Sequence, residues 1–122
     1  LDCLLVTHLP DVRYLSGFTG SNAALVLAGG RSVLFTDGRY TAQAKAEAVG
    51  TRVVIAKKPA VAAACEWIEA AGGKRCGFDA TQTTVTALEA RRKAVSAKLR
   101  RGIFQPVKPL VSALREVKDG KQ

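Results

Sequence analysis

The sequence has one histidine and none of the short motifs that carry hydrolytic or nucleotide chemistry. His8 is the single candidate base for a Ser-His-Asp or Cys-His triad, and no Gly-x-Ser-x-Gly turn exposes a serine. No metal-ligand spacing and no glycine-rich phosphate loop is present. We interpret His8 as a strand-end histidine, and we expect Glu47, Glu66, Glu69 and Glu89 to be exposed on helix faces. The chain is predicted to hold no catalytic residue and no metal ligand.

Cysteine and long apolar runs are also scarce. Cys3, Cys65 and Cys76 are odd in number and far apart, which argues against a zinc knot or a disulfide framework and favours buried thiols in a reducing compartment. No run approaches the roughly 18 residues of a membrane span, and no signal peptide is visible. We therefore expect a cytoplasmic protein. The chain lacks methionine and opens on an apolar run, which we interpret as a trimmed edge.

The rest of the sequence alternates strand-like and helix-like segments, which is typical of an α/β domain. The 122 residues suffice for one domain, 1–122. Gly29-Gly30 joins two apolar runs as a hairpin, so the predicted sheet is mixed rather than purely parallel. It has five or six strands flanked by helices. The strands are expected at 3–7, 22–27, 31–36, 51–56, 75–78 and 103–107, and the helices at 10–16, 39–49, 59–71, 84–99 and 109–117.

The helix at 84–99 is expected to be the longest. Its apolar positions Val85, Leu88, Val95 and Leu99 should share one face. Either Thr84 caps it or residues 86–89 form a capping box, and both alternatives fit the sequence.

Four segments, taken in order, closely resemble the amino-terminal domain of the creatinase, prolidase and aminopeptidase P family. They are Val12–Asn22 (VRYLSGFTGSN), Val33–Tyr40 (VLFTDGRY), Cys76–Asp79 (CGFD) and Leu110–Asp119 (LVSALREVKD). The resemblance covers essentially the whole chain. It implies a ribonuclease-H-like α/β fold without nuclease activity.

The resemblance also implies a parent enzyme, an Xaa-Pro dipeptidase or an Xaa-Pro aminopeptidase. Such a hydrolase is a metalloprotease with two divalent metal ions, such as manganese, cobalt or zinc, in a pita-bread catalytic domain that would follow residue 122. No cofactor is expected in this fragment. The amino-terminal domain of the family builds a dimer or tetramer interface, here expected as a homodimer. It also helps to enclose the active site around proline-containing peptides.

The same resemblance places the loop Phe18–Asn22 beside the active site of the assembled enzyme. Phe18 is expected to offer an apolar surface to a proline ring, and Ser21 and Asn22 to hydrogen-bond a peptide end. Thr19 and Gly20 complete the loop, whose glycine permits close backbone approach. The alternative is a tight structural loop after a helix.

Six further residues are interpreted as interface or structural. Asp37 is expected to cap the helix that follows it, and Arg39 to pair with a carboxylate or reach a neighbour. Packing is favoured for Arg13 and Tyr14. Tyr40 is expected to share one helical face with Ala44 and Ala48, in a packing or an interface role. Trp67 is expected to be partly buried or to lie in an interface.

The net charge of +9 supports a different class of function. Arg91, Arg92, Lys93, Lys98, Arg100 and Arg101 surround one helix and its exit, where they could contact nucleic-acid phosphates. Aromatic residues make up 6% of the chain and none interrupts this run, so nucleic acid is disfavoured as a partner. A stand-alone dimerisation module is the third alternative.

Overall fold

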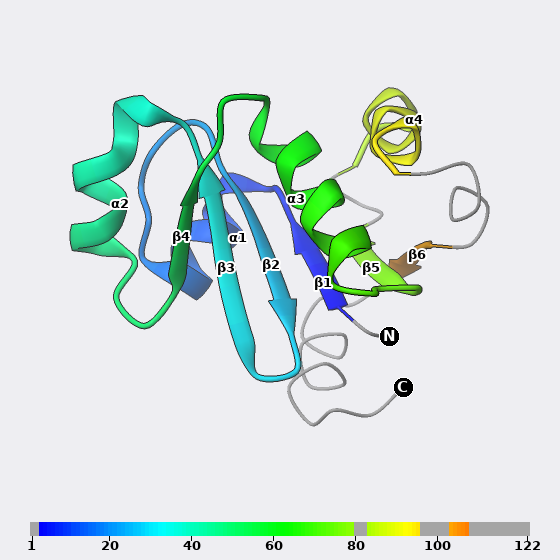
Figure 1. Cartoon of the computed structure of the whole chain (residues 1–122), viewed down its shortest axis with the longest axis horizontal. Helices are drawn as coiled ribbons and strands as arrows, with labels where there is room; N and C mark the ends of the chain where they lie inside the picture. Colours follow the sequence, from blue (N-terminus) through cyan, green and yellow to red (C-terminus); the bar gives the residue numbers. More distant parts are fainter. Residues whose placement is uncertain (1–2, 80–82, 96–102, 108–122) are drawn as a thin grey trace.

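A six-stranded mixed sheet forms the centre of the structure, which is a computed structural model (Figure 1). It describes residues 3–79, 83–95 and 103–107. The elements, in chain order, are β1 (Cys3–Val6), α1 (Leu9–Ser16), β2 (Ala24–Ala28), β3 (Arg31–Thr36), the 3-10 turn η1 (Gly38–Tyr40), α2 (Thr41–Glu47), β4 (Arg52–Ile55), α3 (Ala60–Ala70), β5 (Cys76–Asp79), α4 (Val85–Lys93) and β6 (Phe104–Val107). The predicted α/β class with a mixed sheet and flanking helices is confirmed.

The strand order is β4-β3-β2-β1-β5-β6. Only β2 runs against its neighbours: it pairs antiparallel with β1 and β3, whereas β1–β5, β3–β4 and β5–β6 are parallel. Gly29 and Gly30 join β2 to β3 with φ of 55° and 82°. Positive φ at both central positions is the requirement of the tight hairpin turn that suits the twist of paired strands. The glycine pair therefore fixes the predicted antiparallel hairpin.

Alternation along the strands creates two apolar layers. Leu4 and Val6 of β1 belong to one buried cluster, with residues of α1 and α2, while Cys3 and Leu5 belong to another, with residues of α3. Successive side chains of a strand point to opposite faces, so each face of the sheet buries its own helices. Figure 1 shows α3 in front of the sheet and α1 behind it.

The three cysteines are free and buried, as predicted. Cys3 and Cys76 are register partners on β1 and β5, and Cys65 lies on α3 in the same cluster. Burial raises the pKa of the Cys65 thiol to about 11. The thiols therefore act as small apolar core residues.

The predicted helix 84–99 is too long. α4 ends at Lys93, and the N–H of Ala94 bonds back to Ala90 O at 3.2 Å. Val95 still reaches the core, but Val85, expected on the buried face, is 75% exposed. Val85 is the first residue of α4, and the apolar period of a helix does not decide by itself whether its end residue is buried. Leu99 lies outside the described residues.

The cap of α4 is Thr84, whose Oγ1 accepts a 3.0 Å hydrogen bond from Ala87 N. This settles the choice that the sequence left open. The predicted helix 109–117 lies outside the described residues. Among the described helices, none is long and apolar enough to cross a membrane.

Candidate functional site

Two segments meet where β1 and β3 end. The loop 17–22 leads from α1 into β2, and the turn 37–40 leads from β3 into α2. Because β2 is antiparallel, its start at Ala24 pairs with Phe35 near the end of β3. This topology brings the two predicted segments together, although 14 or more positions of chain separate their bonded residues.

Gly17 turns the chain out of α1. Its φ of 86° is left-handed, and its N–H bonds to Arg13 O at 2.8 Å, which is a glycine cap of the helix. A Cβ at Gly17 would lie 2.8 Å from the carbonyl oxygen of Glu47, so the glycine also lets the loop approach α2. Ser16 Oγ accepts from Phe18 N at 3.2 Å. The loop is thus fixed from its first residue.

Phe18 does not present an apolar surface. The residue is only 1% exposed, and its ring packs edge-on against Tyr40 at 5.6 Å between centroids. A Cβ at Gly20 would lie 2.2 Å from Phe18 Cζ, so Gly20 is needed because the ring passes beneath it. The expectation that Phe18 offers an open surface to a proline ring is therefore wrong for this structure. Its contact with Gly20 instead shapes the loop.

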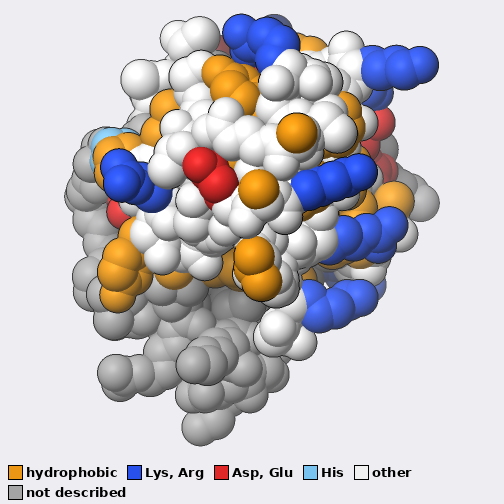
Figure 2. Space-filling model, turned by 90° about the vertical axis from the view of Figure 1, so that its left-hand side faces the viewer, with side chains coloured by type: hydrophobic (Ala, Val, Ile, Leu, Met, Phe, Trp, Pro, Cys, Tyr) orange, Lys and Arg blue, Asp and Glu red, His pale blue; other side chains and the backbone are white. Residues whose placement is uncertain are grey.

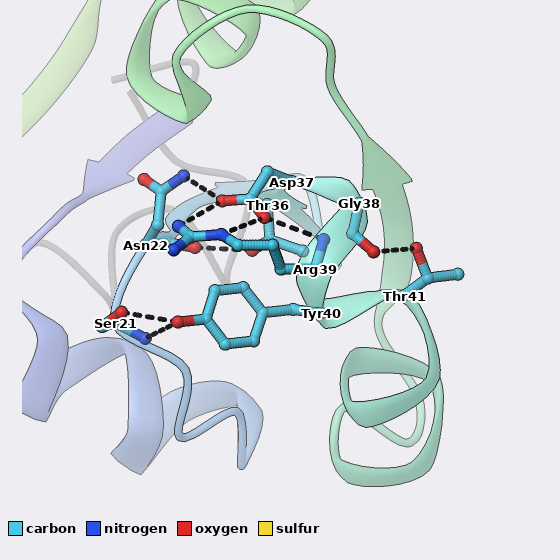
Figure 3. Close-up of polar contacts among 8 residues, drawn as sticks. All are labelled: Ser21, Asn22, Thr36, Asp37, Gly38, Arg39, Tyr40 and Thr41. Atoms are coloured by element: carbon cyan, nitrogen blue, oxygen red, sulfur yellow. Dashed lines mark hydrogen bonds and ion pairs between the residues drawn. The ribbon is translucent and has the colours of Figure 1, made fainter.

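Asp37 organises the turn, as expected for a capping residue (Figure 3). Its Oδ1 accepts from Arg39 N at 2.9 Å, while the Arg39 guanidinium forms a bidentate pair with it at 3.0 and 2.9 Å. Hydrogen bonds from Arg39 and Asn22 hold the pKa of Asp37 well below its ordinary value. The Arg39 side chain remains 69% exposed and lies over the Tyr40 ring. The predicted cap and the predicted carboxylate pair are both present.

The loop and the turn are joined by side chains of Ser21 and Asn22 (Figure 3). Ser21 Oγ lies 2.6 Å from Tyr40 Oη, and Asn22 Nδ2 donates to Asp37 Oδ2 at 2.7 Å. The bonds to Ser21 lower the pKa of Tyr40. Figure 3 shows the amide oxygen of Asn22 pointing away from Asp37. Hydroxyl, amide and guanidinium groups therefore gather on one edge, where Ser21 and Arg39 are exposed and Asn22 and Tyr40 are half-buried.

Sequence reasoning missed Glu47, which was expected to be merely exposed. Its Oε1 accepts from Thr19 N at 2.9 Å, and Thr19 Oγ1 lies 3.0 Å from each carboxylate oxygen. Gln43 Nε2 donates to Thr19 Oγ1 at 2.9 Å. The hydrogen bond from Thr19 N is the main cause that lowers the pKa of Glu47. The loop is thereby attached to α2 as well as to the turn.

A hollow of about 420 Å³ lies between α1 and the outer side of the loop. Leu9, Pro10 and Arg13 line it from α1, with loop residues 18–21 opposite. Arg13 is exposed, and Tyr14 is 86% exposed, so the packing role favoured for these two residues is not observed. Both side chains are available to another surface.

Trp67 lies apart from this site. It is half-buried on α3 and packs edge-on against Phe35 at 6.3 Å between centroids. The partial burial expected from the sequence is confirmed. His8 precedes α1 as its N-cap residue, without a side-chain capping bond.

Metal-ligating side chains do not gather in the part of the chain that the structure describes. Across residues 3–79, 83–95 and 103–107, no group of three or more His, Cys, Asp or Glu could hold a metal ion. The polar groups at the site are the Asp37 carboxylate, which pairs with Arg39, the Glu47 carboxylate, which is bonded to Thr19, two hydroxyls and an amide. This set suits hydrogen bonding to a ligand and does not fit a two-metal centre.

The basic helix offers less positive surface than its sequence suggested. Arg91 is 4% exposed and donates to Thr7 Oγ1 at 2.6 Å. Lys98, Arg100 and Arg101 lie outside the described residues. On the face that carries α2, Figure 2 shows Lys and Arg mainly along the right-hand margin, with others at the top and at the left.

Comparison with known proteins gives a consistent result. A family model described as the creatinase/prolidase N-terminal domain matches residues 1–117. An uncharacterized peptidase, YqhT, of Bacillus subtilis is 30% identical over 122 residues, which are 100% of this chain and 33% of the relative. The chain thus spans about a third of that relative.

Two solved structures share the fold. The N-terminal domain of the cytoplasmic peptidase PepQ from Mycobacterium tuberculosis superposes with a TM-score of 0.81 and 34% identity, covering 94% of this chain and 88% of that one. A Xaa-Pro dipeptidase from Bacillus anthracis gives a TM-score of 0.80 with 27% identity over 93% of this chain and 31% of the dipeptidase.

Proposed function

The chain belongs to the creatinase/prolidase N-terminal domain family, and from this premise we propose that it is the non-catalytic domain of a metal-dependent Xaa-Pro peptidase. Its partner would be a catalytic domain on the same polypeptide. The similarity to about a third of a Xaa-Pro dipeptidase supports this arrangement. The two divalent metal ions would belong to that catalytic domain, since the described residues of this chain lack a suitable ligand set.

Within such an enzyme, the loop 18–22 and the turn 37–40 form part of the wall around the bound peptide. The observation that carries this role is the joined hydrogen-bond network, which fixes exposed polar groups without burying them. A preorganised donor and acceptor set binds a ligand without first paying to order itself. Ser21 and Arg39 are exposed, so their free hydrogen-bonding groups can reach a bound peptide.

The substrate class is a peptide with proline after its first residue. Proline removes one backbone N–H, so recognition of such a peptide relies on carbonyls and termini. The Ser21 and Tyr40 hydroxyls and the Arg39 guanidinium can donate to those groups, and the Asn22 amide oxygen can accept from an amino end. Phe18 acts indirectly, by supporting the loop.

Assembly and location follow the same family. A homodimer is proposed, with exposed Arg13 and Tyr14 beside the hollow as candidate contacts. A cytoplasmic location is supported by the three free buried thiols and by the PepQ domain, whose parent is called a cytoplasmic peptidase.

The test is hydrolysis of Xaa-Pro dipeptides and tripeptides with added Mn²⁺. We expect no activity from the 122-residue chain and activity from a protein that joins it to a catalytic domain. In the active protein, Asn22→Ala and Ser21→Ala should lower kcat/KM, whereas Glu66→Ala on the opposite face of the sheet should not. Unchanged kinetics for both loop variants would refute the enclosing role. Activity of the isolated chain would refute the non-catalytic assignment.

A further inference from the structure

The carboxylate of Glu47 occupies a position that its own helix disfavours. Glu47 is the last residue of α2, where the helix dipole is negative and an acidic side chain is unfavourable. Helix stability therefore gives no reason for a glutamate here, and lysine or arginine would suit the position better. The contacts of the side chain lie elsewhere, on the loop.

Those contacts hold a single loop residue through both its backbone N–H and its hydroxyl. Thr19 N donates to Glu47 Oε1 at 2.9 Å, and Thr19 Oγ1 lies within 3.0 Å of both carboxylate oxygens. Gln43, one turn earlier on α2, donates to the same hydroxyl at 2.9 Å. Both groups of Thr19 are thus engaged away from the exposed edge that carries Ser21 and Asn22.

The residues on either side of Thr19 are held by close contacts, whereas Thr19 itself depends on the carboxylate. Gly17 lies against the Glu47 carbonyl, and Gly20 lies over the buried Phe18 ring. Thr19 is exposed and has no burial of its own to fix it. Hydrogen bonds to a charged acceptor are the stronger kind, so the carboxylate is the main restraint on this residue.

We propose that Glu47 is a positioning residue, which sets the height and orientation of the loop 18–22 over the bound peptide through Thr19. The inference rests on the proposed enclosing role of that loop. Glu47 does not touch the peptide. It acts by keeping Ser21 and Asn22 at the distance from α2 at which they bond Tyr40 and Asp37.

Two measurements test this role. The first is amide hydrogen exchange at Thr19 in the 122-residue chain. Glu47→Ala should speed exchange by about ten- to a hundredfold, the factor that corresponds to a lost hydrogen bond to a charged group. Glu47→Gln retains an acceptor for Thr19 N, so its exchange rate at Thr19 should lie between those of the parent protein and of Glu47→Ala. Glu66→Ala, an exposed glutamate on α3, is the matched control and should leave exchange unchanged.

The second measurement is kcat/KM for a Xaa-Pro tripeptide in the enzyme that contains the domain. Glu47→Ala should lower it by about tenfold or more, as for misplacement of a binding group, with Glu47→Gln again intermediate. Unchanged Thr19 exchange in Glu47→Ala would overturn the positioning role and leave the loop's function to the Ser21 and Asn22 variants. Faster exchange with unchanged kcat/KM would also overturn the positioning role, whereas the enclosing role is overturned only if the Ser21 and Asn22 variants keep their kinetics as well.

Discussion

A methyl group added at Gly20 should displace the ring that supports the loop. The new Cβ would lie 2.2 Å from Phe18 Cζ and 2.6 Å from Cε2, far inside van der Waals contact. Gly20 does not have a left-handed φ, so backbone strain adds nothing to this effect. The ring cannot retreat easily, because Phe18 is 1% exposed and contacts Tyr40 edge-on.

The expected cost of Gly20→Ala is about 1–3 kcal/mol, as for other overpacked cores. With a urea dependence of about 1–3 kcal/mol per molar, the unfolding midpoint should fall by roughly 1 M. Urea titration of the 122-residue chain, followed by the fluorescence of its single tryptophan, Trp67, measures this midpoint.

Gly38→Ala is the matched control. A Cβ at Gly38 meets no heavy atom within 4 Å, and its φ is not left-handed. Its free energy of unfolding should stay within about 0.5 kcal/mol of that of the parent protein, or rise slightly because alanine restricts the unfolded chain. Equal midpoints for Gly20→Ala and Gly38→Ala would refute the steric argument. Combining Gly20→Ala with Phe18→Leu should cost less than the sum of the two, because both changes act on one contact.

Three further outcomes are expected. Thr84→Ala should cost about 1 kcal/mol in urea unfolding because it removes the cap of α4, whereas Thr86→Ala should be nearly neutral. Asp37 has a lowered pKa in the folded state, so its contribution to the free energy of unfolding is present above the ordinary aspartate pKa and is lost as the pH falls. Asp37→Asn should therefore flatten the acid side of a stability-versus-pH curve. Because burial raises the pKa of Cys65 to about 11, an alkaline pH should destabilise the fold as the thiol of the unfolded chain ionises. For the same reason, a thiol-disulfide reagent at pH 8 should label the three buried cysteines no faster than the chain unfolds.

The fold was largely readable because its signals are local. The pair Gly29-Gly30 dictates a hairpin wherever apolar runs flank it, and the alternation in Cys3–Val6 distributes side chains to two faces without reference to the rest of the chain. The overestimated helix 84–99 shows where periodicity fails. Val95 continues the apolar pattern, but it reaches the core from beyond the last turn. The run of basic residues Arg91–Lys93 was the better signal, since cations favour the last turn of a helix.

The site was only half readable, for a physical reason. Asp37 acts on residues one and two positions away, so its cap and ion pair could be predicted from sequence. Phe18 was misjudged because its burial depends on Gly20 and on Tyr40, which lies in the turn η1, 22 positions further along the chain. Residue chemistry states what a side chain can bind, and only tertiary packing decides whether it is exposed to do so.

Two charged residues lie in positions that are unfavourable for a charge of their kind. Comparing them shows when an unfavourable position indicates function. Arg91 is a buried cation whose hydroxyl partners, Thr7 and Thr83, are half-buried, so its network stabilises the contact of α4 with the sheet. Glu47 opposes its helix dipole, and its partner Thr19 is an exposed loop residue. A residue that only packs a core does not need an exposed partner. A loop that binds a ligand, by contrast, is restrained by a residue that does not itself contact the ligand. The unfavourable position of Glu47 therefore points to the loop, while the burial of Arg91 points only to the packing of α4.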